Sequence, residues 1–482
     1  MSATSFNLPL LRLVWTGSSE PRTWLSQRLG EIGVAILLCG GVLAPQWEVT
    51  PTEPRIRREL FILLAIILAY GWMLISGKAK QARIRMFYLI GIVFSLCVGL
   101  STAYGAQILH HSISIRDFSE IPKSWLPMLF FSVGYGAQIS ESGLRRLLNY
   151  LAIAAFLICL LGWGQFFDWK IAAILTPYYG DGSHNDYTLK VYHRIYSTLT
   201  NPNVLSQFLS WTIILYVTAL VFGIGNRFRN MFIPAFCLVN IVLTGSRYGI
   251  LSVVFGFLFI VPLASKTRRG LSRVLRLVML FLVFSVIFAV VSQRGSFVIS
   301  KRFDELRDPM RAGSLRSRLD FLWVEAAQDF LSSPILGHGP VKIMYGHTFT
   351  DSEYLDILKM YGLVGFTVYG FYYWWPLHRI RLGMRNAMGL PHWLEEELRA
   401  TLLVMRFGFV MLAMALFMNI GMFTFLNWYL MCFMWTWTGI SVRASEVVSE
   451  AAELARVPAA RLTPRPLAWD GPARPDLAIN HS

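Results

Sequence analysis

The chain has 482 residues and a formal net charge of +16; 55% of its residues are hydrophobic and only 15% are charged. An ordinary soluble domain carries roughly 25% charged residues, so this composition excludes a soluble globular protein and indicates that lipid is part of its solvent. The positive charge does not indicate nucleic-acid binding, because the Lys and Arg residues lie in short clusters between apolar runs, a pattern typical of membrane topology signals. All five cysteines fall inside apolar runs, which predicts neither a disulfide framework nor a thiolate metal site.

Apolar runs that approach the length needed to cross a bilayer, about 20 residues, recur along the chain. They predict an all-α, polytopic membrane protein with about 12 transmembrane helices. The fourth and seventh runs are short. The expected spans are 31–47, 59–76, 86–104, 125–139, 147–167, 203–224, 231–245, 248–264, 275–291, 357–377, 400–420 and 425–442.

The distribution of Lys and Arg sets the expected orientation. With both termini in the cytoplasm, the inside segments hold 25 of these residues against 9 outside, once one long outer loop is set aside. We therefore expect a cytoplasmic N-terminal segment, nine membrane helices, a periplasmic loop, three more membrane helices and a largely disordered cytoplasmic tail. The corresponding boundaries are 1–30, 31–291, 292–356, 357–442 and 443–482.

The long outer loop, 292–356, is the first candidate for function, because unstructured loops of this length are uncommon. Apolar residues recur at helical spacing from Ser314 to Phe330, and a second amphipathic stretch runs from Asp351 to Tyr361. We expect a helical hairpin on the outer face. The side chains that it offers near the bilayer are Arg316, Arg318, His347, Asp351 and Glu353. A solvated loop with surface ion pairs is the alternative for each of them.

Arginines also stand at the membrane edges. Arg247 lies between two glycines at the outer end of a span, and Arg194 lies just before the sixth span. A guanidinium fork at this interface suits a phosphate or pyrophosphate headgroup, although each side chain can also simply extend to water. Arg406 lies inside the eleventh span, where a buried charge is costly and therefore suggests a functional role. The alternative is that its side chain extends to the cytoplasmic surface.

Motifs for other chemistries are missing from the sequence. It contains no HExxH, no phosphate-binding P-loop and no Asp-x-Asp pair. We therefore expect no metal, no other cofactor and no use of ATP or a nucleotide sugar.

Four segments resemble the O-antigen ligase/polymerase superfamily of bacterial envelope glycosyltransferases. The first runs from Arg194 to the Asn-Pro-Asn element that ends at Asn203, and the second is the Thr-Gly-Ser-Arg turn at Arg247. The third runs from Arg318 through Trp323 to the Pro-Ile-Leu-Gly-His-Gly turn at 334–339, and the fourth from His347 through Asp351-Ser-Glu-Tyr to 362–365. Their order and their placement between spans extend the resemblance over roughly residues 150–420.

The resemblance implies a polytopic enzyme of the bacterial inner membrane, whose large outer loop closes over the site. Such an enzyme takes a glycan from an undecaprenyl-pyrophosphate carrier and passes it to the hydroxyl of a glycan or lipid-linked acceptor, inverting the anomeric centre without metal. Membrane lipid and proteins that control polysaccharide chain length or export are further partners. The catalytic candidates are His347, Asp351 and Glu353. The substrate-binding candidates are Arg194, Arg247, Arg316, Arg318, Tyr354 and Asn203.

Three functions compete. Ligases of this family usually show His-Asn where the long loop returns to the membrane, whereas His347 of this chain is followed by Thr-Phe-Thr. This difference favours a polymerase of O-antigen or exopolysaccharide repeat units. The alternative is an O-antigen ligase that transfers the glycan to the lipid A core. A lipid-linked glycan flippase is an alternative from another class, but transporters often show repeated halves, and this chain shows no clear repeat.

Overall fold

The computed structural model describes residues 24–44, 84–137, 139–179, 189–190, 194–264, 313–341, 350–421 and 427–456, and scattered positions between 272 and 286. This part of the chain consists of helices and connecting turns, without a β-strand, which confirms the all-α prediction. The helices of the first half are α2 (Trp24–Ala35), η1 (Ile36–Gly40), α3 (Gly41–Leu43), α5 (Arg85–Gln107), α6 (Ile115–Phe118), α7 (Glu120–Lys123), α8 (Leu126–Gly136), α9 (Glu141–Phe166), α10 (Lys170–Leu175), η3 (Thr176–Tyr178) and α12 (Pro202–Phe222).

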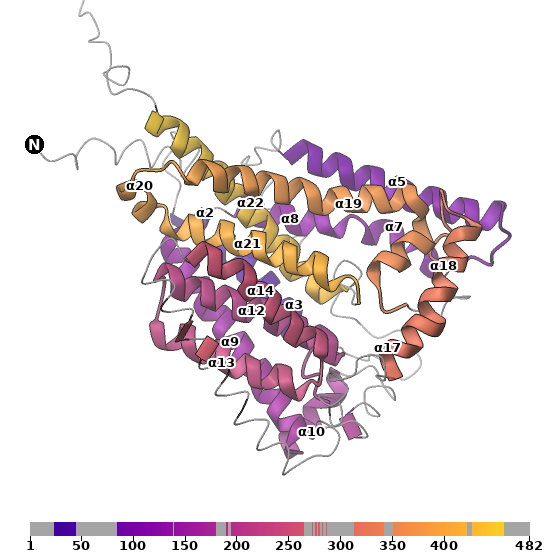
Figure 1. Ribbon diagram of the computed structural model, residues 1–482, viewed down its shortest axis with the longest axis horizontal. Helices are drawn as coiled ribbons and strands as arrows, with labels where there is room; N and C mark the ends of the chain where they lie inside the picture. The colour runs from indigo at the N-terminus through magenta and orange to yellow at the C-terminus, as the bar shows by residue number, and fades with distance from the viewer. Residues whose placement is uncertain are drawn as a thin grey trace, which may run out of the picture.

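The second half contributes long helices on both sides of a short helical segment (Figure 1). These helices are α13 (Arg227–Leu243), α14 (Arg247–Ala264), α17 (Gly313–Ser317), η5 (Arg318–Leu322), α18 (Trp323–Ser332), α19 (Glu353–Ala387), α20 (His392–Glu397), α21 (Arg399–Met418) and α22 (Trp428–Arg456).

Within the described residues, length and composition qualify four helices to cross a membrane: α5, α9, α12 and α21. Two shorter apolar helical stretches, Gly30–Leu43 and Arg247–Pro262, accompany them. The chain is thus an integral membrane protein. The expected count of about twelve spans stays a prediction, in part because 59–76 and most of 275–291 lie outside the described residues.

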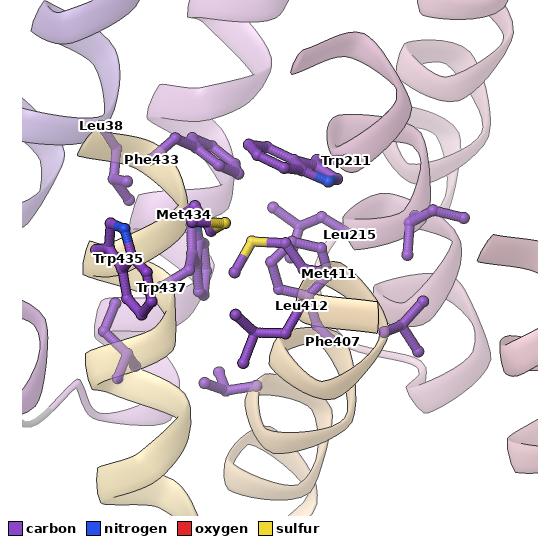
Figure 2. Close-up of a cluster of buried hydrophobic side chains, with 14 of the residues drawn as sticks. Leu38, Trp211, Leu215, Phe407, Met411, Leu412, Phe433, Met434, Trp435 and Trp437 are labelled. Atoms are coloured by element: carbon purple, nitrogen blue, oxygen red, sulfur yellow. The ribbon is translucent and has the colours of Figure 1, made fainter. Parts of the chain in front are cut away.

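The core lies where α12, α21 and α22 meet. Figure 2 shows Trp211 of α12 facing Phe433 of α22, and the two rings stack with centroids 5.9 Å apart. Phe407 of α21 packs edge-on against Trp437, with centroids 5.2 Å apart. Because α12 is buried along nearly its whole length by other helices, it is the central helix of this bundle.

The fourth predicted span, 125–139, forms as the short helix α8. The chain before it, including α7, already packs along α5. The Ser124 hydroxyl hydrogen-bonds the Ser95 hydroxyl at 2.6 Å, and Ser95 lies near the middle of α5. A bilayer-length helix is therefore not needed between Ser124 and the next turn.

Contacts join the segment before α12, the turn before α14, the helix segment before α18 and the residues before α19 at one end of the long helices, hereafter the loop end. The last turn of α5 lies against His338, in the turn after α18. Figure 1 shows α17 and α18 running across this end, beside the first turns of α19. Helix α19 bends at Gly362, whose φ of +63° interrupts the helical backbone. At the opposite end, α22 continues past residue 442 to Arg456. Its residue Glu446 is buried there and bonds to Arg379, Arg443 and Tyr135.

Candidate functional site

Arg194 ties the loop before α12 to the turn after α13. Its Nε donates to the carbonyl oxygen of Thr244 at 2.7 Å, and its Nη2 donates to Oδ1 of Asn203 at 3.1 Å. Asn203 is placed by the helix start, where Asn201 caps α12 and Pro202 occupies the first turn. The Asn-Pro-Asn element thus has a local structural role, and it also gives Arg194 a fixed position at the loop end.

The Thr-Gly-Ser-Arg turn brings Arg247 to the same place. Thr244 ends α13, Gly245 adopts a φ of +59°, and Arg247 begins α14 half-buried. Because Arg194 bonds to Thr244, it is held at the turn that leads to Arg247, although the two arginines are far apart in the sequence. Two guanidinium groups at the start of a helix favour an anion there, since the helix N-terminus adds its own partial positive charge.

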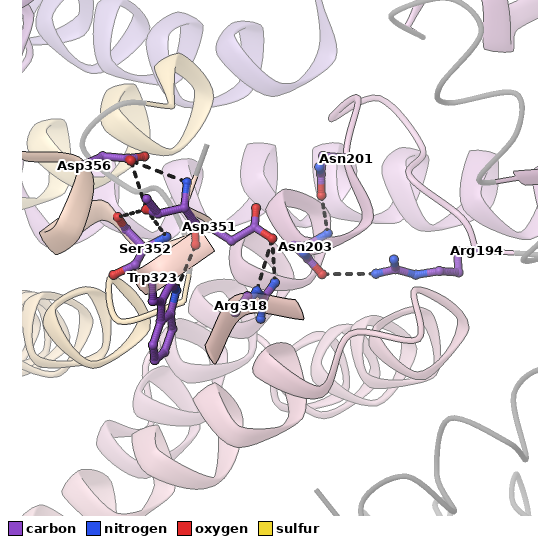
Figure 3. Close-up of polar contacts among 9 residues, drawn as sticks. Arg194, Asn201, Asn203, Arg318, Trp323, Asp351, Ser352 and Asp356 are labelled. Atoms are coloured by element: carbon purple, nitrogen blue, oxygen red, sulfur yellow. Dashed lines mark hydrogen bonds and ion pairs between the residues drawn. The ribbon is translucent and has the colours of Figure 1, made fainter. Parts of the chain in front are cut away.

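Arg318 connects this cluster to the loop helix. Its guanidinium lies over the ring of Tyr248, with 5.6 Å to the ring centroid, and Tyr248 directly follows Arg247. The same group donates to Oδ2 of Asp351 from Nη2 at 2.9 Å and from Nε at 3.2 Å. Figure 3 shows this pair together with the Arg194–Asn203 pair. The side chain of Arg318 is 10% exposed and that of Asp351 is 47% exposed, so the carboxylate faces solvent and the cation lies behind it.

The neighbouring arginine of the loop helix points elsewhere. The side chain of Arg316 is 75% exposed and pairs with Asp320 one turn along, at 3.1 Å, as the spacing of four residues permits. The difference arises because residues two apart lie on nearly opposite sides of a helix, which has 3.6 residues per turn. Of the two alternatives, Arg318 is therefore the arginine that joins the cluster.

Asp351 is held by a network in the residues around it. The backbone at Asp351 has a φ of +54°, which is unusual for a residue other than glycine. Its neighbour Thr350 accepts a hydrogen bond from Trp323 Nε1 at its carbonyl, at 2.9 Å, and its hydroxyl donates to Oδ1 of Asp356 at 2.9 Å. Burial raises the pKa of the Asp356 carboxyl to about 6, against the opposing effects of Lys359 and of the Thr350 hydrogen bonds.

Two of the sequence candidates lie inside the protein. Glu353 is fully buried, and its Oε1 accepts a hydrogen bond from Tyr369 at 2.6 Å, while its backbone NH donates to the Asn419 carbonyl. The Tyr354 hydroxyl donates to the carbonyl of Leu416 at 2.5 Å. Both residues thus anchor the first turn of α19 to α21 and the residue that follows it.

The Pro-Ile-Leu-Gly-His-Gly turn fits between α5 and α19. Gly337 and Gly339 have φ of +71° and +76°, and a side chain at either position would meet backbone of α19 or α5. Between them His338 is buried, and its Nε2 lies 2.8 Å from the Asp329 carbonyl, which fixes the proton on Nε2. Nδ1 of His338 then accepts from Nε2 of His111 at 2.9 Å.

The pair of His111 and His338 was not predicted as a unit. Partial burial and the neighbouring His338 lower the pKa of His111, while Asp329 opposes that shift. The sequence signal was the histidine inside the glycine turn, but its partner lies 227 residues away. The pair fastens the loop helix to the segment after α5.

The remaining candidates from the sequence are His347, Arg406 and the cysteines. His347 lies outside the described residues. Arg406 places its guanidinium over the ring of Phe222, 4.8 Å from the centroid, at the end of α12 away from Asn203. No group of three or more His, Cys, Asp or Glu suited to a metal ion occurs in the part of the chain that the structure describes. All five cysteines are free.

The described residues thus form an integral membrane protein with a basic candidate site at the loop end. Residues 232–370 match the sequence model of a protein family described as O-antigen ligase. The match confirms the resemblance of this part of the chain to the O-antigen ligase/polymerase superfamily. This family implies a membrane glycosyltransferase with lipid-linked glycan substrates. Comparison with curated proteins gave no match.

Proposed function

We propose that this protein transfers a glycan from undecaprenyl pyrophosphate to an acceptor sugar hydroxyl at the periplasmic face of the bacterial inner membrane. The observation that carries the proposal is that Arg194, Arg247 and Arg318 come from three separate segments to the turn at 244–248, in a chain whose residues 232–370 match the O-antigen ligase family. A pyrophosphate ester carries about two negative charges, which guanidinium groups match through paired hydrogen bonds. The membrane places such a headgroup at the level of the helix ends.

In the proposed reaction the acceptor hydroxyl oxygen attacks the anomeric carbon from the side opposite the carrier. The bond between that carbon and the phosphate oxygen breaks, its electron pair leaves with undecaprenyl pyrophosphate, and the configuration inverts. The arginines stabilise the charge that develops on the leaving oxygen, a contribution typically worth 10²- to 10³-fold in rate per donor. The reaction needs no nucleotide and no metal.

A base takes the proton of the attacking hydroxyl. Asp351 is the best-placed candidate among the described residues, because its carboxylate is half-exposed while one of its oxygens is held by Arg318. His347 is the other candidate, since imidazole titrates near neutral pH. Glu353 was also a candidate base, but as a fully buried side chain bonded to Tyr369 it suits a positioning role better.

Within this reaction class we favour a repeat-unit polymerase over a ligase that acts on the lipid A core. The sequence Thr-Phe-Thr after His347, in place of the ligase His-Asn, supports the polymerase. Deleting the gene and sizing the carrier-linked glycans tests this choice. A polymerase leaves single repeat units on the carrier, whereas full-length chains stranded on the carrier would show a ligase.

The flippase alternative is tested with purified protein in vesicles that contain the carrier-linked glycan. An enzyme consumes the donor only when acceptor is added, and it releases undecaprenyl pyrophosphate as it does so. A flippase moves the donor across the bilayer without acceptor and leaves it chemically unchanged. The second result would overturn the proposed function.

A further inference from the structure

Helix α18 and its flanks expose a row of large apolar side chains, here called the apolar row: Phe321, Val324, Leu331 and Ile335. Phe321 is 70% exposed, Leu331 71% and Ile335 64%. The other face of the helix is buried, as Ala326 at 2% exposure shows. The helix also exposes Glu325 and Gln328. Four large apolar side chains on one exposed surface are nevertheless more than a helix that stands in water usually shows.

The depth of the following turn shows where this helix lies along the bundle. Gly339 lies against the backbone of Ser101 and Thr102 in α5, and its NH donates to the Met360 carbonyl at 2.8 Å. Ser101 comes six residues before Gln107, the last residue of α5, and six residues rise about 9 Å along a helix. The turn at the end of α18 therefore lies below the loop end of a helix long and apolar enough to cross the bilayer.

The apolar row also continues onto the outer surface of α19. The NH groups of Leu363 and Val364 donate to the carbonyls of Pro334 and Ile335, at 2.8 Å and 3.3 Å. Leu363 is 50% exposed and Val364 41%. Helix α19 packs against both α5 and α21, two of the four candidate spans, so its exposed apolar side chains are at a depth where lipid surrounds the protein.

We propose that α18 lies in the bilayer leaflet at the loop end, with the apolar row in contact with the acyl chains of that leaflet. The helix then lies in the plane of the membrane surface, with one face on the protein and the other in lipid. The occupant of the row is bulk phospholipid, since the row ends beside Leu363 and Val364, the exposed apolar residues of α19.

The placement has a consequence for Arg318, which lies in the π-helical segment directly before α18. A helix anchored in the leaflet holds Arg318 at the level of the phospholipid headgroups. This consequence rests on the proposed function, because only a lipid-linked donor presents its pyrophosphate there. The embedding itself requires no donor and no reaction.

The test uses nitroxide labels on the full chain in vesicles of phosphatidylethanolamine and phosphatidylglycerol, without any polyprenyl lipid. Leu331→Cys and Phe321→Cys report on the apolar row. Glu325→Cys, an exposed position on the same helix, is the matched control. The unsubstituted chain, treated with the same reagent, gives the background from the five native cysteines, four of which are buried. Collision of each label is measured with oxygen, which concentrates in hydrocarbon, and with a neutral nickel chelate, which stays in water.

We expect the ratio of oxygen collisions to nickel collisions to be several-fold higher at 331 and 321 than at 325. Equal ratios at the three positions would show a helix in water and would overturn the proposal. Labels at 331 and 321 that are shielded from both reagents would show a protein surface covering the row, which also overturns it. Two reporting positions keep the test decisive if one variant does not fold, and neither depends on transfer activity.

Discussion

Neutralising Asp351 probes the charge balance on which the proposed site depends. Asp351→Asn keeps the shape of the side chain but removes the negative partner of a guanidinium that is 10% exposed. Losing one partner of a fully buried pair costs about 3–5 kcal/mol, and exposed pairs contribute about 0–1 kcal/mol. Because Asp351 is itself 47% exposed and Arg318 keeps its contact with Tyr248, we expect a loss of about 1–2 kcal/mol in stability.

The effect on transfer should be much larger than this loss of stability. If Asp351 accepts the hydroxyl proton, Asp351→Asn lowers the rate by about 10²- to 10⁴-fold. Arg318→Ala should lower it by about 10²- to 10³-fold, the usual effect of removing one group that stabilises developing charge. The assay is the initial rate of glycan transfer by reconstituted protein from a carrier-linked donor, with the amount of folded protein measured in parallel.

A double variant and a distant control complete the experiment. Arg318→Ala combined with Asp351→Asn should be no slower than the slower single variant, because residues that act as a unit are not additive. Arg145→Ala removes a guanidinium that pairs with Glu141 on the surface, at the start of α9 and away from the candidate site. This variant should leave the rate unchanged. A wild-type rate in folded Arg318→Ala would refute the role of this guanidinium in binding the pyrophosphate.

Three further perturbations follow from the same contacts. Arg194→Lys should slow transfer about tenfold or more, because one ammonium cannot span the Thr244 carbonyl and Asn203 as the guanidinium does, and an unchanged rate would contradict this. Folding lowers the pKa of His111, so the stability that this residue contributes is present above its ordinary pKa near 6.5 and is lost as pH falls through the lowered pKa. Between pH 7.5 and 5, the thermal midpoint should therefore fall less for His111→Gln than for the wild type. Equal falls would exclude His111 as the cause of the acid destabilisation. Gly105→Ala should destabilise the protein by about 1–3 kcal/mol in thermal unfolding, because the added Cβ would meet the backbone carbonyl of His338. Ala at helical Gly370, where the space is open, should be neutral or mildly stabilising, and equal behaviour of the two variants would contradict the packing described.

The positions of the long helices were predictable because apolar run length is a local property of the sequence. The run 86–104 corresponds to α5, Arg85–Gln107, and the run 203–224 to α12, Pro202–Phe222. The bend at Gly362 was not predictable in the same way. It depends on the backbone of Ile335 and Gly337 lying where a side chain at 362 would be. That approach is a tertiary contact and leaves only an ambiguous glycine in the sequence.

The candidate site was predictable as a set of arginines but not as a geometry. Sequence spacing placed Arg316 and Arg318 on opposite sides of a helix but could not show which side meets Asp351 and Tyr248, because that depends on tertiary packing. In the sequence, Asp351 and Glu353 were equivalent as candidate bases. The structure distinguishes its members, because Glu353 meets Tyr369 inside the bundle while Asp351 stays half-exposed beside Arg318.

The central claim is that the arginine cluster serves transfer from a lipid pyrophosphate, and one measurement tests it most directly. Purified chain in vesicles is given a glycan on undecaprenyl pyrophosphate together with acceptor, without nucleotide or divalent metal, and both products are quantified by mass spectrometry. We predict equal amounts of elongated or glycosylated acceptor and free undecaprenyl pyrophosphate, with both lost in Arg247→Ala. Donor that stays intact in the presence of acceptor, or full activity in Arg247→Ala, would contradict the account.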